Sequence, residues 1–143
     1  MKLEKIFDCQ DGKLIKVDGS AVESGTVSPF ALSWKSVEEG DEGIYNEELL
    51  ASIRLSLKEM EESGKFVFIK GEKDRDGSFE QYTAAMKHAA RRLKDCISIA
   101  GFWIPEDANS EDAALFIEEL SAKHAQYVFF SASKIDGVAT VIA

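Results

Sequence analysis

The chain has few of the residues that cross-link a small fold or interrupt its helices and strands: two cysteines, two prolines and ten glycines among 143 residues. So little proline and glycine argues against a disordered or low-complexity chain. Cys9 and Cys96 lie far apart and outside any CxxC pattern, so we expect reduced thiols rather than a disulfide or metal ligands. At this length a hydrophobic core can stabilise the fold without a disulfide or a structural metal ion.

Positive charge is also scarce. Seventeen Lys and Arg residues face twenty-six Asp and Glu residues, which gives a formal net charge of −9. Such a chain repels phosphate backbones and anionic lipid surfaces, so we expect neither nucleic acid nor membrane as a partner. Glu4 and Asp8 interrupt the N-terminal region where a signal peptide needs an apolar run, and no later run approaches the length of a membrane span. These features favour a soluble cytoplasmic protein.

Several catalytic and binding motifs are missing. The sequence has no glycine-rich phosphate or dinucleotide loop, no serine in a nucleophile elbow and no His/Cys cluster with metal-ligand spacing. His88 and His124 have no neighbours that suggest a shared metal, so both are expected at the surface or at the edge of the core. We therefore expect no metal and no cofactor.

Three segments have the apolar spacing of amphipathic helices, and each begins at a residue that caps helices. The capping residues are Asn46, Ser78, and Asn109 or Ser110. Gly64 supplies a stop for the first helix, as glycine commonly does. The three helices alternate with short apolar runs along the chain.

A basic cluster, Arg91, Arg92 and Lys94, ends the second of these helices. The negative end of the helix dipole stabilises cations at that position. We therefore interpret the cluster as a helix-end feature rather than as a nucleic-acid site.

Four apolar runs are expected to be strands: Phe30–Trp34, Phe66–Lys70, Ile97–Ile104 and Tyr127–Ser131. They are mostly continuous rather than alternating, which is typical of strands covered on both faces. A helix separates each run from the next, as parallel strands require. The fold class is therefore α/β, with a mainly parallel sheet of βαβ units that is either open or half-barrel-like.

Two Asp-Gly pairs predict β-hairpins at the two ends of the chain. Asp11-Gly12 lies between Lys5–Gln10 and Lys13–Val17, and Asp136-Gly137 lies between Tyr127–Ile135 and Val138–Ala143. We expect a single α/β domain over residues 1–143. It consists of an N-terminal hairpin (1–20), a βαβαβαβ core (30–131) and a C-terminal hairpin (127–143).

Ligands of parallel α/β sheets bind beyond the carboxyl ends of the strands, because loops and helix N-termini gather there. Seven side chains at those positions are candidates for a site. Glu106 and Glu72 are the candidate catalytic acid/base and its partner carboxylate. The candidate ligand-binding residues are Trp34, which can act as an aromatic platform, and Lys35, Asp107, Asn109 and Ser131. Helix capping and ordinary solvated loops also account for charge at these positions.

The stretch from Phe30 to Ser131 resembles part of the cellulase-type barrel glycoside hydrolases. The residues that carry the resemblance are Leu32–Trp34, Tyr45–Leu50, Phe66–Ile69 and Gly101–Glu106. It implies a half-barrel architecture, and it places Glu106 where the family has its acid/base.

The chain also departs from the family pattern. Ile104-Pro105-Glu106 lacks the asparagine of the family's Asn-Glu-Pro motif, and the proline precedes the glutamate. Phe30–Trp34 has no counterpart of the family arginine, and Gly71-Glu72 replaces the family histidine. A retaining glycosidase also needs a second carboxylate about 5–5.5 Å from the first. The family draws that carboxylate from a late barrel strand, whereas this chain has about half the strands.

Two function classes remain open, together with a third that depends on the thiols. A non-catalytic binding or interaction module is favoured because an open sheet has edges to cover, and a homo-oligomer is one way to cover them. Its partner is expected to be a small polar ligand or a protein. The alternative is a glycoside-hydrolase-like enzyme that acts on a carbohydrate or a similar polar metabolite, with Glu106 as acid/base. Redox sensing requires Cys9 or Cys96 to be exposed and activated.

Overall fold

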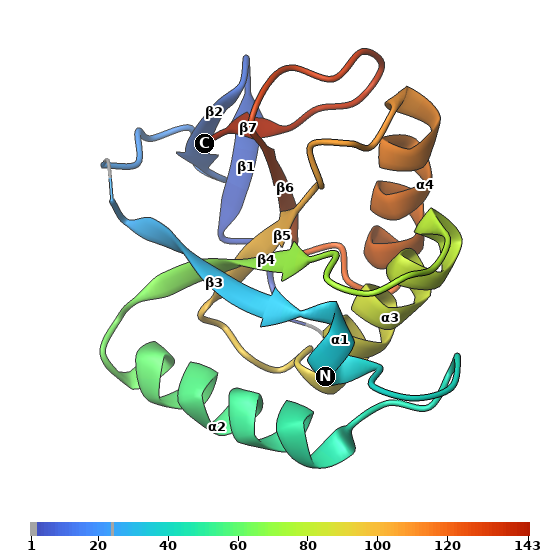
Figure 1. Cartoon of the computed structure of the whole chain (residues 1–143). Helices are drawn as coiled ribbons and strands as arrows, with labels where there is room; N and C mark the ends of the chain where they lie inside the picture. Colours follow the sequence, from blue (N-terminus) through green and yellow to red (C-terminus); the bar gives the residue numbers. More distant parts are fainter. Residues whose placement is uncertain (1–2, 24) are drawn as a thin grey trace.

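The computed structural model describes residues 3–23 and 25–143, which form a five-stranded parallel sheet, a two-stranded hairpin and helices (Figure 1). The strands are β1 (Phe7–Gln10), β2 (Lys13–Lys16), β3 (Val27–Ser33), β4 (Phe66–Glu72), β5 (Ile99–Trp103), β6 (Val128–Ser131) and β7 (Val141–Ile142). The helices are α1 (Trp34–Val37), α2 (Glu47–Glu62), α3 (Phe79–Arg92) and α4 (Ser110–Ser121).

The three long helices begin where the capping residues predicted. The side-chain oxygens of Asn46, Ser78 and Asn109 each accept a hydrogen bond from the amide three residues further on, at 3.0, 3.1 and 2.8 Å. These bonds satisfy amides that the first turn of a helix leaves unpaired. Gly64 follows α2 with a φ of +70°, a conformation that glycine adopts without strain, and the helix ends there.

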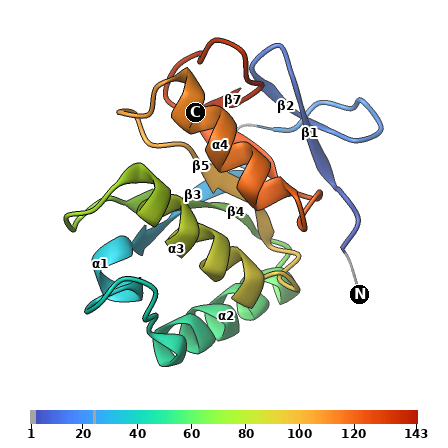
Figure 2. The ribbon, with the colours of Figure 1, turned by 90° about the vertical axis from the view of Figure 1, so that its right-hand side faces the viewer.

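The sheet has the order β3-β4-β5-β6-β7, with every neighbouring pair parallel. Because consecutive strands are neighbours and crossovers are right-handed, the long helices all cover one face. Figure 2 views the molecule from that side, with α3 and α4 toward the viewer. The predicted fold class is therefore confirmed, and the carboxyl ends of β3 to β6 meet at one edge.

The sheet is apolar on both faces. The core on the helix side includes Trp34, Ile69, Tyr82, Phe102 and Phe116. The core on the opposite face is smaller, and consists of Phe7, Phe68, Ala100, Trp103, Val128, Phe130 and Val141. Phe7 comes from the hairpin, so the hairpin covers this second face.

The N-terminal hairpin is confirmed. β1 and β2 pair antiparallel, with Phe7 opposite Lys16 and Gln10 opposite Lys13. Asp11 and Gly12 connect them with φ values of 51° and 77°, and two positive φ angles are what a type I′ turn requires. Phe7 packs edge-to-face on Phe66 of β4, with 5.0 Å between the ring centroids.

The C-terminal hairpin was predicted wrongly, because β7 pairs with β6 in parallel rather than antiparallel. Asp136-Gly137 does turn the chain, and Gly137 has a φ of 82°. Ile135 and Val138 on either side of this turn pack against the core on the helix side. The chain therefore forms a wide loop over residues 132–140 before Val141 and Ile142 return alongside β6 in the same direction (Figure 1).

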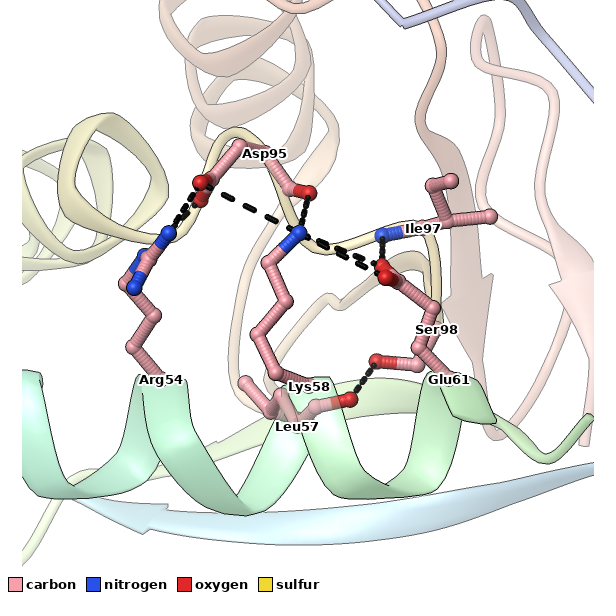
Figure 3. A network of polar contacts seen from close by, with 7 residues as sticks. All are labelled: Arg54, Leu57, Lys58, Glu61, Asp95, Ile97 and Ser98. Carbon is pink, nitrogen blue, oxygen red and sulfur yellow. Dashed lines mark hydrogen bonds and ion pairs between the residues drawn. The ribbon is translucent and has the colours of Figure 1, made fainter. Parts of the chain in front are cut away.

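A polar network fastens α2 to the loop between α3 and β5 (Figure 3). Arg54 binds the Asp95 carboxylate through Nε, at 3.0 Å, and Nη2, while Lys58 donates to the Asp95 carbonyl at 2.6 Å. The Arg54 hydrogen bond lowers the pKa of Asp95 below its usual value. Ser98 then donates to the Leu57 carbonyl at 2.7 Å, so the start of β5 is held against α2.

None of the helices in residues 3–23 and 25–143 is both long and apolar enough to cross a membrane.

Candidate functional site

The carboxyl edge of the sheet is built from the loops that follow β3, β4, β5 and β6. These strands end at Ser33, Glu72, Trp103 and Ser131. The candidate residues all lie in or next to these loops, as their sequence positions predicted. The contacts between the loops determine which side chains are free to meet a ligand.

Asp74 ties the loop after β4 to the loop after β3. Its carboxylate accepts hydrogen bonds from the Ser33 hydroxyl and from the Lys35 amide, the latter at 2.7 Å. Burial by itself raises the pKa of Asp74, but these hydrogen bonds outweigh burial and the net pKa is lowered. The backbone of Lys35 is therefore fixed, while its side chain is exposed.

Trp34 is completely buried, with 0% of its surface exposed. Its ring packs edge-to-face on Tyr82 at 5.3 Å, and its Nε1 donates to the Glu38 carboxylate at 2.7 Å. A ligand therefore has no free face of Trp34 to stack on. In this structure the residue anchors α1 to α3 instead of offering the expected aromatic platform.

Glu38 is a buried carboxylate that the sequence did not single out, and its side chain is 0% exposed. Besides Trp34, it accepts hydrogen bonds from the Gly43 amide at 2.7 Å and from Gln81 at 3.0 Å, and Arg75 lies 4.0 Å away. Burial by itself raises the pKa of Glu38. The hydrogen bonds and the Arg75 charge outweigh it, so the net pKa lies below the usual value.

Asp107 is held by an ion pair across the β4 and β5 loops. Lys73 donates to it at 2.7 Å, although 67% of the Asp107 side chain is exposed. Lys73 also lies 5.5 Å from the centre of the Phe79 ring. Asp107 is thus available to solvent but already has a partner, whereas Glu72 at the end of β4 is exposed and makes no side-chain bond within the described residues.

A hollow of about 350 Å³ lies between the loops after β5 and β6. Three predicted site residues line it: Glu106, Asn109 and Ser131. The Asn109 side-chain oxygen already caps α4. The Ser131 hydroxyl is buried and bonds to Thr140 at 2.6 Å and to the Ser133 carbonyl at 2.8 Å. Asn109 and Ser131 therefore form part of the wall of the hollow, but their side-chain oxygens already have hydrogen-bond partners.

Three charged side chains at the hollow remain unpaired. Glu106, Lys134 and Asp136 all line it and all are exposed. In the part of the chain that the structure describes, none of them makes a side-chain hydrogen bond or ion pair. Lys134 and Asp136 were not predicted as site residues, because the Asp136-Gly137 turn was assigned to a hairpin. Charged, unpaired groups around a concave surface are suited to a polar ligand.

Glu106 and Glu72 do not share this hollow, because Glu72 is not among the residues that line it. Both carboxylates are exposed. Among residues 3–23 and 25–143, no group of three or more His, Cys, Asp or Glu side chains is arranged to hold a metal ion. The site therefore offers groups that can bind a ligand, but Glu106 and Glu72 do not form a pair that could act together on one glycosidic bond.

Neither cysteine has the environment of a reactive thiol. Burial raises the pKa of Cys96 to about 11, and burial is also the main cause that raises the pKa of Cys9. A reactive thiol needs a lowered pKa, since the thiolate is the nucleophile. The structure therefore gives redox sensing no support.

No protein-family model matches this sequence, and no curated protein matches it either. Solved structures do match its fold. Endoglucanase Cel5A from Pseudomonas stutzeri, solved in complex with cellobiose, superposes with a TM-score of 0.60 at 15% identity. A GH5_18 protein from Bifidobacterium longum subsp. infantis superposes with a TM-score of 0.55 at 8% identity. Its counterpart from Bifidobacterium longum subsp. longum, in complex with Manb1-4GlcNAc, has a TM-score of 0.54 at 8% identity.

These matches cover 72–73% of this chain but only 34–36% of the matched chains. The chain therefore spans about a third of the length of the matched proteins, and its fold resembles part of these GH5 cellulase-type structures. The resemblance predicted from sequence is confirmed at the level of the fold. Within the described residues the sheet does not close, and the hairpin covers the face that lines the interior of a closed barrel.

Proposed function

We propose that this chain is a non-catalytic binding module that holds a small polar ligand in the hollow between the loops after β5 and β6. The observation that carries the proposal is the rim of that hollow. Glu106, Lys134 and Asp136 are exposed there and have no partner within the described residues. Other charges at the same edge are used to hold loops together, as Asp74 and Asp107 are.

The rim favours a ligand with several hydroxyl groups. Two carboxylates accept hydrogen bonds and one ammonium donates them, which suits a neutral polyol better than an anion. The hollow, of about 350 Å³, is at the small end of the usual range for ligand sites. Two of the matched solved structures contain a saccharide, cellobiose in one and Manb1-4GlcNAc in the other. A mono- or disaccharide is therefore the ligand class that we propose.

The alternative is a glycoside-hydrolase-like enzyme, and one observation gives it a specific form. Glu106 shares the hollow with Asp136 rather than with the predicted partner, Glu72. An enzyme would therefore use Glu106 and Asp136. A catalytic acid of this class usually lies in a buried, apolar environment, whereas both of these carboxylates are exposed. Binding without hydrolysis is thus the better supported function.

A thermal-shift screen against mono- and disaccharides tests the binding proposal. A saccharide present at about 100 times its Kd adds about 2.7 kcal/mol, which raises the unfolding midpoint by several degrees. We expect that shift in the parent protein, a much smaller shift in Glu106→Gln, and the full shift in Glu111→Gln, which alters an exposed carboxylate in the first turn of α4. No shift with any saccharide, or equal shifts in both variants, would overturn the proposal.

Chromogenic glycosides separate binding from catalysis. We expect the parent protein to release no chromophore beyond the rate of a buffer blank. If the parent protein does hydrolyse a glycoside, and if both Glu106→Gln and Asp136→Asn abolish this activity, the protein is an enzyme and the binding-module proposal is wrong.

A further inference from the structure

A second concave surface lies between α3 and α4. The two helices pack side by side on the helix-covered face of the sheet (Figure 2). This α3–α4 groove has a volume of about 710 Å³, twice that of the hollow beside Glu106. It runs along the second half of α3 and the end of α4. Because crossover helices run antiparallel to their strands, these helix ends lie toward the amino edge of the sheet, away from the proposed saccharide site.

The groove is positively charged although the whole chain carries a net charge of −9. Four basic side chains, Lys87, Arg91, Lys94 and Lys123, line it together with a single carboxylate, Glu119. Glu119 is paired with Lys87 at 2.7 Å. The positive charge of the other three is therefore not neutralised from within the groove.

Arg91, Lys94 and Lys123 are exposed and make no side-chain hydrogen bond or ion pair with any residue that the structure describes. Arg92, their neighbour in sequence, points to α2 instead and binds Glu47 at 2.8 Å. The basic cluster that the sequence presents at the end of α3 is thus divided in the fold. One member ties two helices together, and the other two face the groove.

The helix dipole explains why cations are tolerated here but not why three of them converge without a counter-charge. Like charges close together repel, and an anion in the groove removes that cost. The groove also indicates what kind of anion fits. Helix C-terminal ends present carbonyls rather than free amides, so it lacks the amide cradle that commonly binds a compact phosphate.

The spacing of the cations matches an extended chain. Lys87 and Arg91 are four residues apart on one face of α3, so they lie about 6 Å apart along the helix at 1.5 Å per residue, and Lys94 follows in the turn after α3 ends at Arg92. In an extended peptide, side chains on one face recur about every 6.6 Å. Two acidic side chains at alternate positions can therefore meet Lys87 and Arg91, while Lys94 and Lys123 line the same groove from the turns that follow α3 and α4.

We propose that the α3–α4 groove binds an acidic, extended peptide segment of a partner protein. This surface is separate from the saccharide site. The proposal therefore stands or falls independently of the proposed function.

Fluorescence anisotropy with a labelled peptide of alternating Glu and Gly residues tests the proposal on the full chain. We expect saturable binding that weakens as salt is added, since the contacts are between exposed charges. Arg91→Glu combined with Lys94→Glu should weaken binding about tenfold or more, because each reversal replaces an attraction with a repulsion. Lys16→Glu combined with Lys65→Glu makes the same change in net charge at exposed positions outside the groove and should leave the affinity within about twofold.

Absence of binding, or an equal loss in both double variants, would overturn the proposal, since the latter means that only net charge matters. The proposal would also be overturned if the groove binds inorganic phosphate or ATP instead of the peptide. In that case the Arg91/Lys94 variant would abolish phosphate or ATP binding, and the peptide would not compete with it. Sedimentation equilibrium gives a further check. If the chain self-associates, and if both high salt and the Arg91/Lys94 variant remove this self-association, the groove binds a second copy of this chain. That result would also overturn the peptide proposal. Glu106→Gln should leave peptide binding unchanged.

Discussion

Glu38 is a buried carboxylate with several bonding partners at the carboxyl edge. Its carboxylate joins α1, through Trp34, to α3, through Gln81, and it fixes the following loop through the Gly43 amide. Removing one partner from a buried polar network leaves the others unsatisfied, and that costs more than the interaction itself contributes.

Glu38→Ala should therefore lower the free energy of unfolding by about 3 kcal/mol, because it leaves the buried Trp34 Nε1–H without an acceptor and Arg75 without its nearby carboxylate. Urea unfolding followed by tryptophan fluorescence measures the change. The neighbouring Glu39 is exposed, and Glu39→Ala should change stability by less than about 0.5 kcal/mol. Equal, small effects at the two positions would show that the network contributes little to stability.

The lowered pKa of Glu38 predicts how stability depends on pH. A carboxyl group with a folded-state pKa below its unfolded value of about 4.3 stabilises the fold above that value, and this contribution is lost as pH falls through the folded pKa. The neutral side chain in Glu38→Gln cannot titrate. Its unfolding midpoint in urea should therefore fall less steeply than that of the parent below about pH 4. Parallel pH profiles would contradict the assignment.

The paired strands β5 and β6 approach so closely that only glycine fits at position 101. A Cβ on Gly101 would overlap the carbonyl oxygen of Val128, which belongs to the paired strand and cannot move aside as a flexible side chain can. The β5–β6 pair carries both sides of the proposed saccharide hollow, so this close approach also sets the shape of the site.

Gly101→Ala should therefore destabilise the protein by about 3 kcal/mol, at the upper end of the cost of overpacking, or prevent folding. Thermal unfolding followed by circular dichroism measures it. Gly40→Ala is the matched control, because a Cβ at Gly40 meets nothing within 4 Å and its φ is not positive. Similar unfolding midpoints for Gly101→Ala and the parent would mean that the strands can separate at little cost.

The sequence allowed the helices and most of the sheet to be predicted because their signals are local. The caps at Asn46, Ser78 and Asn109 involve residues three positions apart. The direction of β7 was not predictable in the same way. Its turn signal, Asp136-Gly137, is local, but the packing of Ile135 and Val138 that overrides a hairpin depends on a core built from residues far apart in the sequence.

The candidate site was predictable only as a region, for the same reason. Strand ends identify the edge, but the partners of its charges come from other loops: Lys73 meets Asp107 and Asp74 meets Ser33. Glu38 was missed because it opens the acidic stretch Glu38–Glu42, which has the composition of a solvated loop. Its hydrogen bond to Trp34, four residues earlier, is visible only once α1 is known to be helical.

The N-terminal hairpin separates the second face of the sheet from water. Phe7 is its anchor, with 3% of its surface exposed and contacts to the aromatic core of that face. Phe7→Asp should detach the hairpin, because a carboxylate cannot occupy that apolar position unpaired.

We expect Phe7→Asp to bind the dye ANS and to be cleaved readily near Asp11-Gly12 in limited proteolysis. Val17→Asp, at a position that is 55% exposed just after β2, should behave as the parent does in both assays. If Phe7→Asp binds no more dye than the parent, the hairpin is not needed to cover the sheet.

The same hairpin limits what can be made from this fold. A chimera that joins β3–β7 to the remaining strands of a full barrel would need the space that Phe7 and its neighbours occupy, so it would have to omit residues 3–20. The outer strands set further limits: β7 offers only two residues for pairing, and Pro29 in β3 lacks the amide that a new neighbouring strand would bind. Tandem fusion of two intact copies should therefore yield two separately folded sheets rather than one closed cylinder.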